Sequence, residues 1–118
     1  MTGQGADTRL DCQLEQRAHA IVVSVTGAVD LTTQGIFADA VADALRERAT
    51  VVIIDLAEVT FMSSPGLAVL VDAHENAMRA HKVVHVAIGT GVVKRSIEVT
   101  GLGEILSLVP DVQTALDR

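Results

Sequence analysis

Two adjacent serines followed by a proline and a glycine form the segment with the clearest chemical potential. They lie in residues 61–67 (FMSSPGL), between an apolar run and a stretch of helical periodicity. Serine is a favoured N-cap, and proline is well tolerated at the first position of a helix. The segment therefore predicts a helix that begins at Ser64 and Pro65, with Gly66 leaving its first turn sterically open.

The hydroxyl of Ser64 has two interpretations that the sequence alone does not separate. In the first, the hydroxyl only caps the helix by accepting a hydrogen bond from a backbone N–H group. In the second, Ser64 is a phosphorylation site, because a phosphate there would lie at the positive end of the helix dipole, near free N–H groups. Both interpretations need the same geometry.

Two aspartates are the next candidates for chemistry. Asp30 precedes a predicted helix, so either it or Thr32 is expected to act as the N-cap. Asp55 lies near the end of an apolar run and could form half of a catalytic carboxylate pair with Asp30. No histidine or lysine base supports that pair, so we expect Asp55 to accept hydrogen bonds from loop N–H groups instead.

The patterns for metal, nucleotide and thiol chemistry are incomplete. His74 and Glu75 lack the second histidine of a zinc helix, because Met78 stands at that position. Residues 89–91 (GTG) lack the third glycine of a dinucleotide loop, which favours a plain strand-to-helix turn. Cys12 is the single cysteine and has no partner for a disulfide. We expect no catalytic residue, no metal site and no cofactor.

The elements that must position these residues follow from hydrophobic periodicity. Alternation at residues 10–15 and 21–27, with a turn at 17–19, predicts an antiparallel hairpin. Further strands are predicted at 51–56, 83–88 and 105–108. Helices are predicted at 33–48, from Ser64 onward, at 91–100 and from Pro110. The buried stripe of the Ser64 helix is expected to comprise Leu67, Leu70, Val71, His74 and Met78.

This order, β-β-α-β-α-β-α-β-α, predicts a single α/β domain with a mixed β-sheet packed against helices. Strands separated by helices pair in parallel through right-handed crossovers, and the N-terminal hairpin adds an antiparallel edge. We expect residues 1–8 to form a flexible tail and residues 9–118 to form the domain.

Composition narrows the class of function. The 118 residues include nine Lys and Arg against fifteen Asp and Glu, for a net charge of −6, with no Trp or Tyr. This composition opposes binding to nucleic acid, which needs clustered basic and stacking side chains. The longest apolar run spans five residues, 67–71, far below the ~20 of a membrane span. The polar N-terminus predicts no secretory signal, so we expect a cytoplasmic protein-binding module without direct membrane insertion.

Several of these segments, taken in order, resemble STAS domains, specifically the anti-sigma factor antagonists. Residues 51–56 (VVIIDL) with 59–67 (VTFMSSPGL) resemble the signature of the family. Residues 27–31 (GAVDL) resemble its glycine-to-aspartate turn. Residues 100–102, Leu106 and residues 109–116 resemble its C-terminal ending. The similarity covers residues 9–118.

The resemblance implies a regulatory binding protein and not an enzyme. In the family, the dephosphorylated protein binds an anti-sigma factor, itself a serine kinase of the GHKL ATPase type, and frees a sigma factor. The kinase then phosphorylates the serine that matches Ser64, which switches binding off, and a serine phosphatase resets it. The partner-binding residues that the resemblance implies are Asp30, Ser63, Ser64, Gly66 and Leu67.

Two residues depart from the family pattern at the serine. Ser63 stands where aspartate is usual, and Pro65 stands where serine or threonine is usual. Ser63 thereby becomes a rival acceptor for the phosphate. These departures keep a second hypothesis open, in which the chain is a non-phosphorylated STAS accessory subunit of a membrane transport complex.

Overall fold

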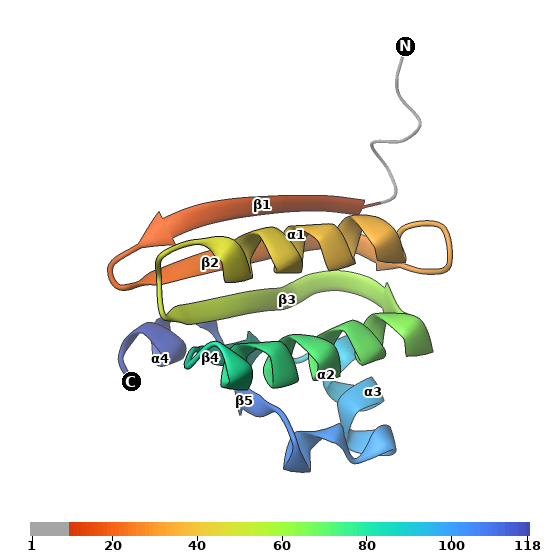
Figure 1. Cartoon of the computed structure of the whole chain (residues 1–118). Helices are drawn as coiled ribbons and strands as arrows, with labels where there is room; N and C mark the ends of the chain where they lie inside the picture. The colour runs from red at the N-terminus through yellow and green to blue at the C-terminus, as the bar shows by residue number, and fades with distance from the viewer. Residues whose placement is uncertain (1–9) are drawn as a thin grey trace.

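The computed structural model describes residues 10–118, and the predicted tail at residues 1–8 lies outside them. The chain opens with a hairpin of β1 (Leu10–Arg17) and β2 (Ala20–Val29), then alternates helices and strands (Figure 1). The remaining elements are α1 (Gln34–Arg46), β3 (Val51–Met62), α2 (Ser64–Arg79), β4 (Val83–Ala87), α3 (Val92–Thr100), the short 3-10 helix η2 (Leu102–Glu104), β5 (Ser107–Val109) and α4 (Val112–Leu116). The predicted element order and the mixed sheet are confirmed.

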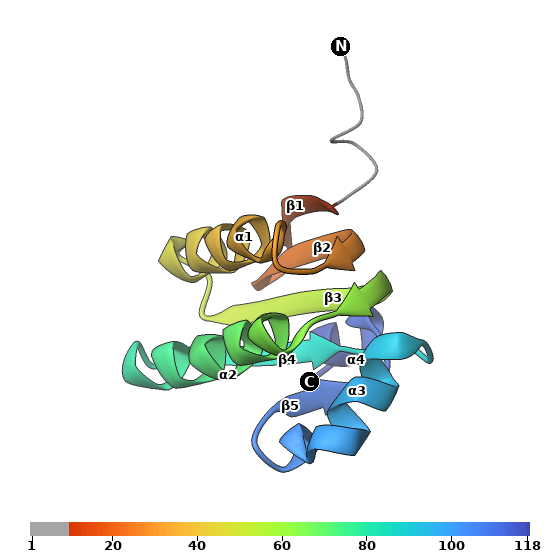
Figure 2. The ribbon, with the colours of Figure 1, turned by 90° about the vertical axis from the view of Figure 1, so that its right-hand side faces the viewer.

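The sheet has the strand order β1-β2-β3-β4-β5, antiparallel between β1 and β2 and parallel elsewhere. Figure 2 shows α1 and α2 together on one side of this sheet. They cover the larger core cluster, to which α3 contributes Val93 and Ile97. The short helix α4 covers a smaller cluster on the opposite face through Ala115.

Side-chain alternation along β3 explains why both faces are covered. Val52, Ile54 and Leu56 belong to the larger cluster, whereas Ile53 belongs to the smaller one. Each of these side chains is 0–1% exposed. Burying one such side chain stabilises the fold by about 1.5–3 kcal/mol, so β3 is the structural centre of the domain.

The strand β3 runs six residues beyond its predicted end at residue 56. The polar and exposed residues of this extension, such as Glu58 and Thr60, interrupt the apolar run on which the prediction rested. The pairing with β2 shifts register between Ser24 and Thr26 and again after Gly27, which has a φ of 114°. These irregularities hid the continuation of both strands, because β2 was also predicted to end at Gly27.

The buried stripe of α2 differs in part from its prediction. Met78 is 62% exposed, and Val71 and His74 are only partly buried. The small side chains of Ala73 and Ala77 occupy the buried positions instead. The last strand is also shorter than predicted, because Ile105 and Leu106 precede β5 and Ile105 is 48% exposed.

Candidate functional site

Two turns that the sequence singled out meet at the carboxyl edge of the sheet. Val29 and Met62 are register partners at the ends of the parallel strands β2 and β3. The Val29 carbonyl accepts a hydrogen bond from Ser63 N at 2.8 Å. The next residues of each chain segment, Asp30 and the serine pair, therefore leave the sheet side by side. The structure thus brings together three predicted site residues from two distant segments.

The first turn is held by the carboxylate of Asp30. Its Oδ1 accepts hydrogen bonds from Thr32 Oγ1 at 2.8 Å, from Thr32 N at 2.9 Å and from Thr33 N at 3.0 Å. The Thr32 hydroxyl, together with the other hydrogen bonds from Thr32 and Thr33, lowers the pKa of Asp30, because each favours the charged carboxylate. Neither Asp30 nor Thr32 occupies the N-cap position of α1, which belongs to Thr33.

Thr33 is a buried polar residue that sequence reasoning missed. It is 1% exposed, and its Oγ1 donates to Ala28 O at 2.7 Å while accepting from Asp30 N at 2.9 Å. Its hydroxyl thus ties the end of β2 to the start of α1. An aspartate followed closely by threonine is a known turn-forming pattern, and it is the signal that could have identified Thr33.

The second turn assigns different roles to its two serines. Ser63 has extended backbone, with φ −75° and ψ 165°, and its Oγ accepts from Gly66 N at 3.1 Å. Ser63 is therefore the N-cap of α2, and the interpretation of Ser64 as the cap is wrong. Ser64 is the first helical residue, is exposed, and makes no side-chain hydrogen bond to any part of the chain that the structure describes.

The first turn of α2 is tightly packed, contrary to its prediction as sterically open. A Cβ at Gly66 would lie 2.5 Å from Met62 Sδ and 2.8 Å from Val29 Cγ1. Gly66 is buried, and Leu67 is 7% exposed within the larger core cluster. These two residues hold the helix start against the ends of β2 and β3, and their side-chain positions are not exposed for contact with a partner.

Exposed apolar side chains flank the two turns and were also missed by sequence reasoning. Leu31 follows Asp30 and is 76% exposed, and Phe61 lies two residues before Ser63 and is 50% exposed. Single exposed apolar side chains are common on protein surfaces, so these two gain interest only from their places next to the two turns. We call the group formed by Asp30, Leu31, Phe61, Ser63 and Ser64 the site surface.

Among the described residues, a buried oxygen beside the Asp30 turn lacks a hydrogen-bond partner. It is Oε1 of Gln34, the first residue of α1, whose backbone N–H donates to Asp30 O at 2.9 Å. A buried, unpaired amide oxygen costs free energy. The start of α1 is therefore less completely hydrogen-bonded than the Asp30 turn beside it.

The other chemical candidates have structural roles. Asp55 accepts from a nearby backbone N–H, that of Ala57 at 3.1 Å, although Ala57 belongs to β3 and not to the loop that was predicted. Gly89 has a φ of 62° and lies against Ala57, which fits a plain strand-to-helix turn. Burial, with a smaller effect of Asp11, raises the pKa of Cys12 to about 11, which makes its thiol unreactive. Within residues 10–118, no cluster of His, Cys, Asp and Glu is arranged to hold a metal ion.

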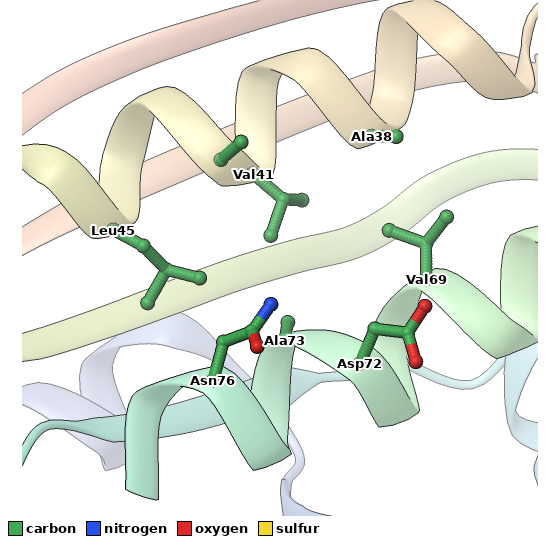
Figure 3. A pocket seen from close by; sticks show the side chains of 8 residues that line it. Ala38, Val41, Leu45, Val69, Asp72, Ala73 and Asn76 are labelled. Carbon is green, nitrogen blue, oxygen red and sulfur yellow. The ribbon is translucent and has the colours of Figure 1, made fainter. Parts of the chain in front are cut away.

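A hollow between α1 and α2 is separate from the site surface. Its volume is about 200 Å³, and Figure 3 shows Val41 and Leu45 of α1 opposite Val69, Asp72 and Asn76 of α2. The lining starts more than one helical turn along α2 from Ser64. Among the described helices, none is both long enough and apolar enough to cross a membrane.

The fold and its paired turns define a STAS-type α/β domain. The family model described as "Mlab, STAS domain" matches residues 12–110, which is most of the chain. The anti-sigma-F factor antagonist RsfB of Mycobacterium tuberculosis is 32% identical over 95 residues, which cover 80% of this chain and 77% of that protein. The chain therefore belongs to the STAS-domain family of anti-sigma factor antagonists, as the sequence resemblance predicted.

Solved structures agree with this assignment. The crystal structure of an anti-sigma factor antagonist from Mycobacterium paratuberculosis is 26% identical, covers 97% of each chain and superposes with a TM-score of 0.87. The unphosphorylated form of the anti-sigma factor antagonist SpoIIAA is 19% identical, covers 92% of this chain and 95% of its own, and has a TM-score of 0.73. At that identity, the second comparison establishes the likeness of the folds alone.

Proposed function

We propose that this chain binds an anti-sigma factor that is also a serine kinase of the GHKL ATPase type, and thereby releases a sigma factor. Phosphorylation of Ser64 by that kinase would switch the binding off. The observation that carries the proposal is the exposed, unbonded hydroxyl of Ser64 beside the Asp30 turn. RsfB, the relative described above, is itself named as an antagonist of an anti-sigma factor.

The site surface supplies the means to bind a protein partner. Leu31, which follows Asp30, and Phe61, which lies two residues before Ser63, offer exposed apolar side chains. In protein interfaces, a few such side chains carry most of the binding free energy, while surrounding polar groups fix the orientation. Gly66 and Leu67 contribute indirectly, because they hold α2 in the position that presents Ser64.

Local hydrogen bonding at α2 favours an electrostatic switch. The N–H of Gly66 is taken by Ser63 Oγ, the N–H of Leu67 is taken by Ser63 O, and Pro65 has none. A phosphate on Ser64 would therefore have fewer free backbone N–H groups to accept from than the sequence analysis predicted for this helix start. It carries about −1.5 to −2 charges and relies on water for solvation. A docked partner removes that water, and a penalty of ~3 kcal/mol would weaken binding about a hundredfold.

In this account the chain is a binding protein and a kinase substrate. The carboxylate of the adjacent turn, Asp30, does not serve Ser64 as a base, since it is committed to Thr32 and Thr33. A serine phosphatase would reset the switch by removing the phosphate. Sigma factors and their regulators act on cytoplasmic RNA polymerase, so we place the protein in the cytoplasm.

Calorimetric titration against purified GHKL-type anti-sigma factor kinases from the source organism tests the proposal. We expect one of them to bind the unphosphorylated chain, and Leu31→Asp to weaken that binding at least tenfold. Val99→Asp is the matched control, because Val99 is 80% exposed but lies on α3, and it should bind normally. Absence of binding to every such kinase would contradict the proposal and favour the transport-complex alternative.

A further inference from the structure

The outer side of β1 is an open sheet edge. β1 is the first strand in the sheet order and pairs only with β2 among the described strands. Figures 1 and 2 show that no described helix or strand lies beyond it. Within residues 10–118, the outer side of this eight-residue strand has no partner strand, and the backbone N–H and C=O groups of such an edge form a template for another strand.

Side-chain alternation divides β1 into two faces. Leu10 and Cys12 pack with the larger core cluster beneath α1, so the alternate residues lie on the other face of the sheet. Those residues are exposed and mostly charged: Asp11, Gln13, Glu15 and Arg17. A strand added to this edge would therefore place its own side chains directly beside these charges.

A second copy of the chain is the partner that these charges fit. Two β1 strands related by a two-fold axis pair antiparallel, and backbone hydrogen bonding requires the axis to pass through a residue. An axis at Gln13 places Asp11 opposite Glu15, and an axis at Glu15 places that residue opposite itself. Both arrangements oppose like charges. An axis at Cys12 overlaps only residues 10–14 of the described strand.

An axis at Leu14 places no two like charges opposite each other. It places Asp11 opposite Arg17 twice, once on each side of the axis, and Gln13 opposite Glu15. It also sets Leu14, the one exposed large apolar residue of β1, against its own copy. Opposite charges and apolar side chains directly across from each other stabilise antiparallel pairs.

We propose that two copies of this chain associate through β1, antiparallel and with the two-fold axis at Leu14, to form one continuous sheet. The net charge of −6 on each copy repels the other at long range, so the dimer is weak and needs high protein concentration. The sheet ends that carry the site surface point in opposite directions in this dimer, so each remains open to its own partner.

Charge exchange tests the proposal. Sedimentation equilibrium of the full chain up to about 1 mM should show a concentration-dependent dimer. Arg17→Asp and Asp11→Arg should each weaken the dimer at least tenfold, because each opposes like charges across the axis. The double variant, Asp11→Arg with Arg17→Asp, should regain dimerisation. Arg48→Asp, the same charge change as Arg17→Asp but outside β1, is the matched control, and its dimer should be clearly stronger than that of Arg17→Asp.

Three results of this experiment would count against the β1 dimer. A wild-type chain that stays monomeric throughout the series would overturn it. A double variant that stays as weak as the single ones would overturn the register at Leu14. Equal weakening by Arg17→Asp and Arg48→Asp would mean that net charge alone governs association.

Discussion

The turns at Asp30 and at Ser63 occupy equivalent places in the fold and are built differently. Each follows a parallel strand, lies at the same edge of the sheet and leads into a helix on the same face. In the first turn, the side chains of Asp30 and Thr33 are bonded to the backbone around them. In the second turn, Ser63 is similarly committed, but Ser64 is not.

This difference shows which group the protein can modify without unfolding. Phosphorylation removes the hydroxyl proton, so a hydroxyl that donates within a turn, as Thr33 Oγ1 does to Ala28 O, would lose that hydrogen bond. A neighbouring hydroxyl with no structural partner can gain a phosphate while the turn stays intact. In the proposed function, the phosphate is therefore carried by Ser64, whose side chain has no hydrogen-bond partner among the described residues, and the neighbouring Ser63 keeps its role as the helix cap.

The largest expected effect concerns the packing of the second turn. We expect Gly66→Ala to lower the free energy of unfolding by about 3 kcal/mol, because the new Cβ would overlap Met62 Sδ and Val29 Cγ1. Gly35→Ala is the control, since nothing lies within 4 Å of a Cβ at Gly35, and it should stabilise α1 by up to about 1 kcal/mol. Chemical denaturation measures both. Equal stability of the two variants would mean that the helix start is loosely packed.

The next largest effect concerns the first turn. Thr33→Val keeps the shape of the side chain but removes the hydroxyl that pairs with Ala28 O and Asp30 N. Leaving these buried groups unpaired should cost about 2 kcal/mol. Thr33→Ser keeps the hydroxyl and should therefore retain most of the stability that Thr33→Val loses. Thermal unfolding of the pair checks this, and a valine variant as stable as the serine variant would refute it.

The two serines should differ in their effect on stability. Ser63→Ala should cost about 1 kcal/mol, because it removes the N-cap bond to Gly66 N. Ser64→Ala should change the free energy of unfolding by less than about 0.5 kcal/mol, because the hydroxyl is exposed and unbonded. Urea denaturation of both variants compares them directly. The reverse order would assign the cap to Ser64.

The smallest effect is a pH dependence in the Asp30 turn. The folded-state pKa of Asp30 is lowered by its hydrogen bonds, first from the Thr32 hydroxyl, so its contribution to stability is complete above the unfolded pKa of about 3.9. That contribution is lost as the pH falls through the lower folded pKa. The difference in stability between wild type and Asp30→Asn should therefore shrink below about pH 4, as followed by thermal unfolding. A difference that grows on acidification would contradict this sign.

The sequence predicted the order of elements well because that order depends on local periodicity. The alternation in residues 10–15, the apolar run in 51–56 and the helical spacing in 33–48 required no knowledge of distant contacts. The ends of β2 and β3 were missed because irregular pairing interrupts the alternation there. Bulged strands lose the pattern on which such predictions depend.

Only part of the candidate site could be predicted from the sequence, because the rest of it depends on tertiary contacts. Ser63 and Ser64 are equally good caps in isolation, and only the backbone geometry decides between them. The burial of Gly66 depends on Val29, which lies 37 residues earlier and reaches α2 only through the register of β2 with β3. The roles of Thr33 and Leu31 depend likewise on the folded turn. Contacts of this kind are set by tertiary structure and leave little trace in local spacing.

In the proposed function, Ser64 and not Ser63 receives the phosphate. The most direct measurement incubates the wild type, Ser63→Ala and Ser64→Ala with the kinase that binds the chain and with ATP, and determines each intact mass. We expect one added phosphate on the wild type and on Ser63→Ala, and none on Ser64→Ala. A full phosphate on Ser64→Ala, with none on Ser63→Ala, would contradict this assignment by moving the switch to the helix cap.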